Sequence, residues 1–205
     1  MKQIILTALF SVLLLAASCS GNKVTNDGGE ANNTAAVINN IMTRTSIRQF
    51  TSQPIGSDTL TALVKAGMAA PTAVNKQPWS FIVVTEREVL DSLMNVHPYS
   101  NLATATAAIV VCGEMEKALD GFGRDYWIQD CSAATENILL AAHAYGLGAV
   151  WCGVYPNPNV IPGVKRVLSI PGAVTPLSLI TLGHPADNPA PKDKWNPENV
   201  HYQKY

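Results

Sequence analysis

The sequence predicts an α/β or α+β sandwich, and three observations support this fold class. Short strands rich in aromatic and β-branched residues alternate along the chain with segments of helical periodicity. The longest helical segment, 125–145, is rich in alanine and apolar nearly all round, as expected of a helix in a core or at a subunit interface. No strand is followed by a GxGxxG or Walker glycine loop, and Gly146-Leu147-Gly148 is too short for one. The usual dinucleotide-binding fold is therefore not expected.

The predicted elements follow from local patterns. Residues 34–42 place Val37, Ile38 and Ile41 on one helical face. A second helix, 57–69, follows the capping residues Ser57-Asp58 and is ended by Pro71. The remaining elements, in chain order, are strand 79–85, helix 87–96, strand 107–112, helix 125–145, strand or tight turn 148–152, helix 162–168 and strand 177–182.

The two ends of the chain differ in composition from the rest. Residues 1–19 have a basic start, an apolar run too short to span a bilayer, and small residues before Cys19, which predicts a lipoprotein-type signal with Cys19 as the lipidated residue. Residues 20–33 are polar and glycine-rich, and we expect a flexible linker. The folded domain is then 34–205, and the aromatic residues of its irregular tail, 185–205, favour packing on a partner subunit.

Charge and cysteine usage narrow the function classes. The formal net charge is −1, which does not indicate nucleic-acid binding. Cys112, Cys131 and Cys152 have neither CxxC nor Cys/His spacing, so no metal site is predicted. We expect these three cysteines to be buried packing residues.

A phosphate site is one interpretation of Arg44, Ser46 and Arg48. In an extended segment these alternate residues project to one face, where two guanidinium groups and a hydroxyl suit a phosphate dianion. The alternative is a solvated helix end with basic residues near its C-terminus.

Three further segments could contact a ligand. Asn75 and Gln77, in the turn between Pro71 and Pro78, carry amides that match the donors and acceptors of a flat heterocycle; an ordinary helix-to-strand connection is the alternative. Glycines within 146–153 allow close approach of backbone to a ligand, whereas the alternative is a helix cap before a buried strand. Lysines within 189–195 could add charge at the phosphate, or belong to a solvated tail.

The order and spacing of these segments resemble the nitroreductase family of FMN-dependent oxidoreductases, in its short single-domain branch. The resemblance covers about 34–205 and rests on Arg44-Thr45-Ser46-Ile47-Arg48-Gln49-Phe50, Ala70-Pro71-Thr72-Ala73-Val74-Asn75-Lys76-Gln77-Pro78-Trp79-Ser80-Phe81, Gly146-Leu147-Gly148-Ala149-Val150-Trp151, and Leu182-Gly183-His184-Pro185 leading to Lys194. It implies an α+β fold with a central, mostly antiparallel sheet flanked by helices, and a homodimer with FMN at its interface.

The resemblance also implies roles for individual residues. Arg44, Ser46 and Arg48 would hold the phosphate and ribityl chain, and Lys194 stands where the family often has a phosphate-binding arginine. Asn75 would face the flavin ring. Pro71 and Thr72 would approach FMN from the partner chain. Val150, Trp151 and Gly153 would line the ring by backbone and packing. Thr45 departs from the family's usual second arginine, which would weaken phosphate binding slightly.

The implied reaction passes a hydride from NADH, NADPH or another donor through the flavin to a nitroaromatic, a quinone or a similar acceptor, with donor and acceptor using the same slot in turn. No side-chain acid–base pair is required. Two alternatives stay open: reductive dehalogenation or other flavin chemistry beneath a lid at 114–127, and a surface lipoprotein that binds without turnover. The signal predicts a membrane-anchored protein of the cell envelope.

Overall fold

The protein folds around one antiparallel sheet. The computed structural model describes the backbone of residues 27–205 and the side chains from residue 32 onward. The four strands are β1 (Trp79–Val84), β2 (Ala107–Glu114), β3 (Gly148–Gly153) and β4 (Val174–Gly183), and their order in the sheet is β1-β2-β4-β3. Every neighbouring pair is antiparallel. The predicted α+β class with an antiparallel sheet is confirmed.

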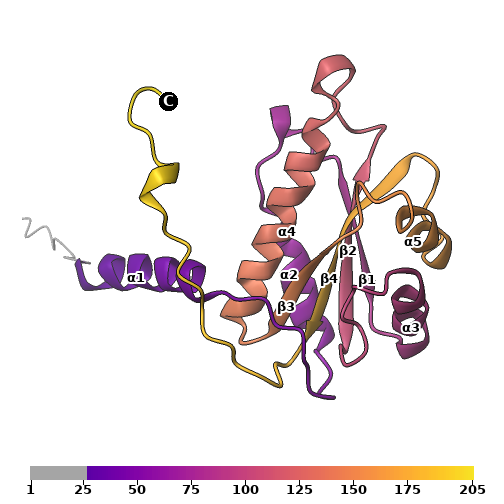
Figure 1. Ribbon diagram of the computed structural model, residues 1–205, viewed down its shortest axis with the longest axis horizontal. Helices are drawn as coiled ribbons and strands as arrows, with labels where there is room; N and C mark the ends of the chain where they lie inside the picture. Colours follow the sequence, from indigo (N-terminus) through magenta and orange to yellow (C-terminus); the bar gives the residue numbers. More distant parts are fainter. Residues whose placement is uncertain (1–26) are drawn as a thin grey trace, which may run out of the picture.

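Helices cover both faces of the sheet (Figure 1). Helices α2 (Ser57–Met68) and α4 (Tyr126–Ala144) pack on one face, and α3 (Arg87–Val96) and α5 (Ile161–Val167) on the other. The central strands β2 and β4 are therefore almost entirely buried. Alternate residues of β2 enter the two cores: Ile109 and Val111 face α2 and α4, whereas Val110 and Cys112 face α3 and α5.

Helix α4 ends as its sequence predicts. Gly146 takes a φ of 69°, its N–H donates to the carbonyl of His143, and the N–H of Leu147 donates to the carbonyl of Ala142. This pair of bonds is the Schellman arrangement, in which a glycine in the left-handed region closes a helix. The chain can therefore turn directly from α4 into the edge strand β3.

Most predicted boundaries lie within about two residues of the observed ones, and the starts of α1 and β4 differ more. Helix α1 (Asp27–Thr43) begins at Asp27 rather than at Thr34, so residues 27–33, predicted as part of a flexible linker, are helical. Once the downstream turns exist, each added helical residue gains a hydrogen bond, and this outweighs the low helix propensity of glycine and asparagine. Strand β4 begins at Val174 rather than at 177. Pro176 lies beside a register shift between Val111 and Cys112, and a strand tolerates proline at such an irregularity.

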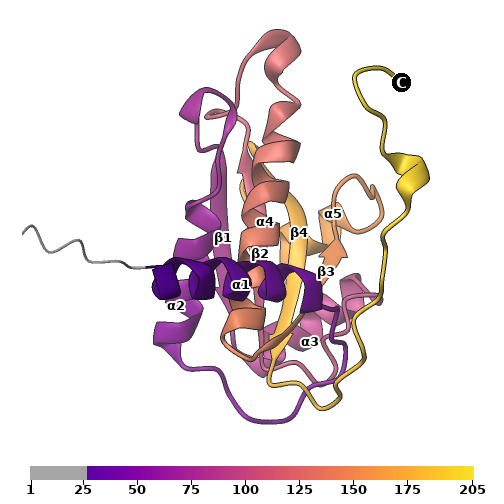
Figure 2. The same ribbon diagram turned by 90° about the vertical axis from the view of Figure 1, so that its left-hand side faces the viewer.

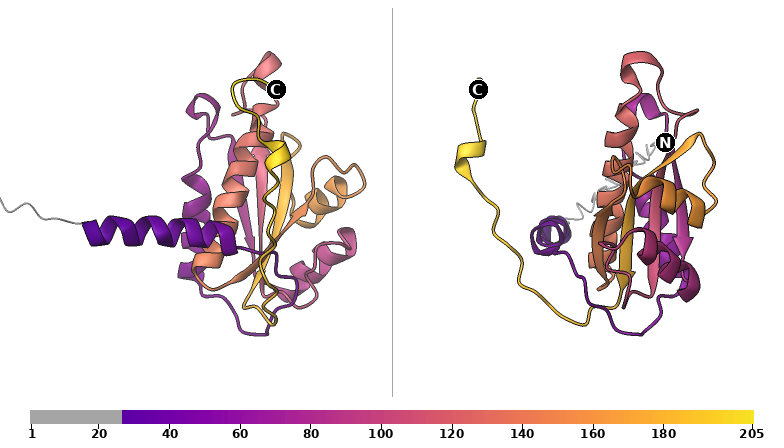
Figure 3. Two further views of the ribbon diagram at one scale, coloured as in Figure 1. Left: turned by 60° about the vertical axis from the view of Figure 1, so that its left-hand side comes forward. Right: turned by 45° about the vertical axis from the view of Figure 1, so that its right-hand side comes forward.

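Helix α1 and the C-terminal tail extend away from the body of the molecule (Figures 1 and 2). Near its end α1 is joined to α4 by two contacts: the Asn40 amide donates to the Leu140 carbonyl at 3.0 Å, and Thr43 Oγ1 lies 2.9 Å from His143 Nε2. The tail leaves β4, passes the end of α1 and carries a short 3₁₀ turn, η3 (Pro197–Asn199) (Figure 3). Large apolar side chains are exposed on both segments, namely Val37, Ile38, Ile41, Met42, Trp195, Val200, Tyr202 and Tyr205.

The predicted signal segment 1–19 and its Cys19 lie outside the described residues. None of the helices within residues 27–205 is both long enough and apolar enough to cross a lipid bilayer.

Candidate functional site

The arginine segment, residues 44–50, is docked on the open edge of the sheet. The N–H of Ile47 donates to the Ala149 carbonyl of β3 at 3.0 Å, and Phe50 forms a β-bridge with Pro185 just after β4. The side chains of Ile47 and Phe50 are buried in the core beneath α3 and α5. Backbone pairing and two apolar anchors thus fix the direction in which the intervening polar side chains project.

Two glycines make this docking possible. A Cβ on Gly148 would lie 2.7 Å from Ile47 Cγ2, and a Cβ on Gly183 would lie 2.7 Å from Phe50 Cβ. Both distances are too short for non-bonded carbon atoms. The glycines therefore serve close packing of the segment on the sheet.

The polar residues of the arginine segment line a cavity of about 940 Å³. The end of α1, the α4 side chain Glu136 and the tail from Asp187 to Trp195 complete its wall. Among the predicted cofactor residues, this cavity brings together Arg44, Thr45, Ser46, Arg48 and Lys194. The expected convergence of one tail lysine with the two arginines is present.

The cavity carries four basic side chains, from Arg44, Arg48, Lys192 and Lys194, and three carboxylates, from Glu136, Asp187 and Asp193. Arg44 is paired, with its Nε 3.5 Å from Glu136 Oε1. Arg48 differs, because within the described part of the chain no carboxylate oxygen lies within 4.0 Å of it. Its guanidinium is therefore available to an anion.

The loop between α2 and β1, residues 71–78, lies elsewhere. It includes the 3₁₀ turn η1 (Ala73–Asn75), and the N–H of Ala73 donates to Asp130 Oδ1 near the start of α4 at 2.8 Å. Arg44, in contrast, meets Glu136 further along the same helix. Pro71, Thr72 and Asn75 do not line the cavity, so a single chain does not bring the two predicted halves of the site together.

The edge strand β3 presents backbone groups to the open side. Because the Ala149 carbonyl points to Ile47 and away from β4, the N–H and C=O of Trp151 point the same way by strand alternation. Trp151 is partly exposed, but the Val150 side chain is buried beneath α3 and α5. The buried Val150 side chain is therefore not free for the packing role that the resemblance implies, and its N–H and C=O point to β4 by the same alternation.

Cys152 packs as expected of a buried cysteine. Its Sγ lies 3.2 Å from the Ser100 carbonyl, and burial raises the pKa of its thiol. Burial likewise raises the pKa of Cys112 and of Cys131 to about 12 in each case. None of the three thiols is activated as a nucleophile.

The histidines do not form an acid–base pair with another side chain in the cavity. The ring of His143 is satisfied by a hydrogen bond with Thr43 Oγ1. Burial lowers the pKa of His97, and the Gly153 carbonyl, which faces the ring without meeting hydrogen-bond geometry, offsets part of this effect. In the region from 27 to 205, no cluster of three His, Cys, Asp or Glu side chains could hold a metal ion.

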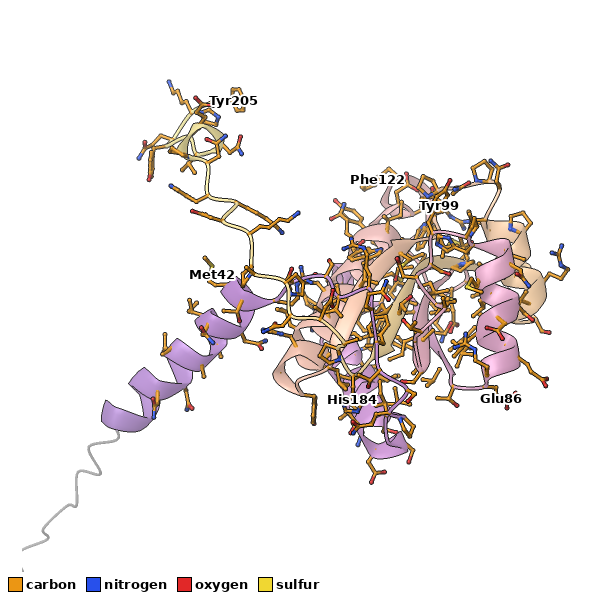
Figure 4. All side chains as sticks on the ribbon, turned by 60° about the horizontal axis from the view of Figure 1, so that its bottom comes forward. Met42, Glu86, Tyr99, Phe122, His184 and Tyr205 are labelled. Carbon is orange, nitrogen blue, oxygen red and sulfur yellow. The ribbon has the colours of Figure 1, made fainter. Side chains whose placement is uncertain are left out.

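The predicted lid region contains only a short exposed turn. The 3₁₀ turn η2 (Gly121–Gly123) carries Phe122, whose side chain is fully exposed at the end of the molecule (Figure 4). Gly121 has a φ of 60°, which permits the sharp turn. Between β2 and α4 the structure thus offers an aromatic tip and not an extended lid.

Sequence reasoning missed two carboxylates on α4, Asp130 and Glu136, because the helix is apolar nearly all round. Asp130 is buried and meets the 71–78 loop, whereas Glu136 faces the cavity. The sequence does show two acidic residues in an otherwise apolar helix. Because a buried carboxylate needs a polar partner, this pattern could have indicated that both make specific contacts.

A model of the Nitroreductase family matches residues 41–96 and 94–184, which include the arginine segment, the 71–78 loop and β3. A relative from Methanothermobacter thermautotrophicus, provisionally named NADH dehydrogenase/NAD(P)H nitroreductase, is 44% identical over 82% of this chain and 87% of its own length.

Solved structures agree with this assignment. A protein from Parabacteroides distasonis with the same provisional name is 38% identical, with a TM-score of 0.78 over 83% of this chain and 99% of that one. An FMN-dependent nitroreductase from Clostridium difficile is 26% identical, with a TM-score of 0.75 over 82% of this chain and 99% of that one. From the extent of the family match and the identity to the archaeal relative, this chain belongs to the nitroreductase family of oxidoreductases.

Proposed function

We propose that the protein is an FMN-dependent oxidoreductase that takes a hydride from NADH or NADPH and reduces a nitroaromatic, a quinone or a similar acceptor. The observation that carries this proposal is the cavity in which Arg44, Ser46, Arg48 and Lys194 converge. The names of the similar proteins supply the cofactor and the donor, since they include an FMN-dependent nitroreductase and NAD(P)H nitroreductases.

The cavity fits the phosphate of FMN. Arg48 has no carboxylate partner in the part of the chain that the structure covers, and Ser46 Oγ makes no hydrogen bond there. A guanidinium binds a phosphate through two parallel hydrogen bonds, and a serine hydroxyl can donate a third. Arg44 would shift between Glu136 and the phosphate, so this carboxylate would compete with the ligand.

The open edge of β3 fits the ring of FMN. The backbone N–H and C=O groups of Trp151 lie on the same edge as the docked arginine segment. The pyrimidine side of a flavin ring presents donors and acceptors that such backbone groups can pair. A ligand anchored by its phosphate at the arginines could therefore lay its ring along β3.

We propose that the working unit is a homodimer. The apolar face of α1 and the aromatic residues of the tail are exposed in one chain, although such surfaces are normally covered. The 71–78 loop also lies apart from the arginine cavity of its own chain. In a twofold dimer, Pro71, Thr72 and Asn75 from one subunit would complete the cofactor site of the other.

The side chains would bind, orient and shield, because bound FMN supplies the redox chemistry at its ring. Arg48, Ser46 and Lys194 would hold the phosphate end, and β3 with Trp151 would fix the ring plane. Donor and acceptor are expected to use the same face of the flavin in turn, as a ping-pong reaction requires.

We further propose that the protein is held at a membrane of the cell envelope through a lipid on Cys19. The support is the apolar run before Cys19 and the small residues next to it. Metabolic labelling of the full chain with a radioactive fatty acid tests this: label on the wild type but not on Cys19→Ser is expected, and label on both would contradict it.

An absorbance spectrum tests the main proposal. Protein comprising residues 20–205 is incubated with FMN, passed through a gel-filtration column and scanned for flavin bands. We expect a yellow protein at the elution volume of a dimer, which oxidises NADH or NADPH when a nitroaromatic or a quinone is added. A colourless wild-type protein would contradict the proposal and favour a lipoprotein that binds without turnover.

A further inference from the structure

A buried carboxylate of α4 holds the loop that carries Asn75. Asp130 is only 6% exposed, and its Oδ1 accepts a hydrogen bond from the Ala73 N–H at 2.8 Å. The bond joins a side chain of the most buried helix to the backbone of an exposed loop. A carboxylate acceptor in a poorly solvated position makes a stronger hydrogen bond than a neutral acceptor.

The loop needs such a restraint, because its backbone is strained. Val74, Asn75 and Gln77 have φ values of 49°, 56° and 49°, in the left-handed region that non-glycine residues disfavour. Val74 is the most unusual of the three, since a β-branched side chain is rarely found there. Its side chain is 80% exposed, so packing does not compensate for the strain.

Hydrogen bonds offset the backbone strain of this loop. The N–H of Gln77 donates to Thr72 Oγ1 at 3.0 Å, and the N–H of Asn75 donates to the Thr72 carbonyl at 3.1 Å. These bonds close the loop on itself. The bond from Ala73 to Asp130 ties this network to the rigid core, and the neighbouring α4 residue Cys131 reaches the end of the loop, where its Sγ lies 4.0 Å from the Pro78 carbonyl.

The same network orients the Asn75 amide. Gln77 Nε2 donates to Asn75 Oδ1 at 3.1 Å, which leaves the Asn75 amide nitrogen to donate outward. A donor aimed at a carbonyl oxygen of a flavin ring stabilises the negative charge that the ring gains on reduction. The orientation of one amide would therefore affect both cofactor affinity and reduction potential.

We propose that Asp130 is a positioning residue, which, through the Ala73 N–H, holds residues 72–77 in the conformation where Asn75 donates to the flavin. This role rests on the proposed FMN-dependent function, and Asp130 acts through the loop without touching the cofactor.

The test compares three variants of the protein comprising residues 20–205. Asp130→Ala removes the acceptor, and Asp130→Asn keeps an oxygen in the same place. Thr135→Val is the matched control, because Thr135 is buried on the same helix and its hydroxyl pairs with Ser178 at 2.9 Å, away from the loop. Each variant is measured for FMN dissociation constant, midpoint potential of bound FMN, and unfolding by urea without FMN.

We expect Asp130→Ala to bind FMN about 10-fold more weakly, the effect of one lost hydrogen bond to a charged group. Its midpoint potential should shift to a more negative value. Asp130→Asn should stay within about twofold of the wild-type affinity. Thr135→Val should lower the stability of the apoprotein but leave affinity and potential unchanged.

Any of three results would overturn the role of Asp130. Asp130→Ala could keep the wild-type FMN affinity and midpoint potential. Asp130→Asn, or the control Thr135→Val, could lose as much FMN affinity as Asp130→Ala. The proposed function fails separately, and takes this role with it, when the wild type binds no FMN. A wild type that binds FMN alongside an unaffected Asp130→Ala variant refutes the positioning role alone.

Discussion

The arginine segment and the 71–78 loop are held in place by different forces. Ile47 and Phe50 fix the arginine segment by burial in the core, and Gly148 and Gly183 give it room to approach the sheet. The loop buries none of the residues of η1 and depends on hydrogen bonds, among them the one to Asp130. Burial is non-directional and hydrogen bonding is directional. The arginine segment should therefore be sensitive to side-chain volume added beneath it, and the 71–78 loop to the loss of a single hydrogen-bond acceptor.

The largest effect is expected from added volume under the arginine segment. Gly148→Ala and Gly183→Ala each place a Cβ 2.7 Å from an anchor side chain, which must then shift. Overpacking of this kind costs about 1–3 kcal/mol of unfolding free energy. Because the anchors set the direction of Arg44, Ser46 and Arg48, FMN affinity should fall as well. Urea unfolding and fluorescence titration with FMN measure the two effects.

Gly172→Ala is the control for both glycine variants, since a Cβ added at Gly172 would meet no atom within 4 Å. Its stability should stay within about 0.5 kcal/mol of the wild type. If all three glycine variants bind FMN equally well, the docking of the segment does not determine the cofactor site.

The next largest effect is expected on FMN binding when the unpaired guanidinium of Arg48 is removed. Arg48→Ala should weaken FMN binding by about 10- to 100-fold, because hydrogen bonds to charged groups contribute about 1.5–3 kcal/mol. Unfolding without FMN should change little, since Arg48 is exposed and unpaired within the described residues. Titration of the apoprotein with FMN measures the loss, and Arg166→Ala, an exposed arginine on α5, is the matched control. Equal affinity in Arg48→Ala and the wild type would place the phosphate elsewhere.

The contrast between the two segments also explains what could be predicted from the sequence. Alternation predicted that Arg44, Ser46 and Arg48 share a face, because side-chain direction in an extended segment is a local property. All three line one cavity, but Thr45 and Gln49 line it too, so their common face stays a prediction. The strands and helices around the site were likewise recognisable from their apolar periodicity, to within a few residues at their ends.

The loop could not be predicted in the same way. A left-handed Val74 contradicts local preference, and it depends on bonds to Thr72 and on the distant Asp130. Nothing near position 130 in the sequence indicates which backbone group its carboxylate will meet. Contacts of this kind are decided by tertiary packing, which can override local propensity.

A smaller effect tests the strain in the loop. Val74→Gly should stabilise the protein by up to about 1 kcal/mol, because glycine adopts the left-handed region without the steric cost, although its unfolded chain has more entropy. The exposed Val74 side chain loses little packing on removal. Val83→Gly is the control: Val83 is also exposed but lies in strand β1, so its replacement should destabilise. Urea unfolding of both variants is the measurement, and destabilisation of similar size would show that the loop is unstrained.

The smallest expected effect is the pH dependence of the loop's anchor. Burial raises the pKa of Asp130, and the hydrogen bond from Ala73 lowers it in part. The pKa in the folded state then lies above the unfolded value of about 3.9. A folded state that binds the proton more tightly is favoured at low pH, and this contribution is lost as pH rises through the raised pKa.

Relative to Asp130→Asn, which does not titrate there, the wild type should lose unfolding free energy as pH rises from about 4. Arg48 contacts no carboxylate among the described residues, so Arg48→Ala should keep the wild-type slope. Parallel pH curves for the wild type and Asp130→Asn would show that folded and unfolded wild type bind the Asp130 proton equally, which would contradict the raised pKa.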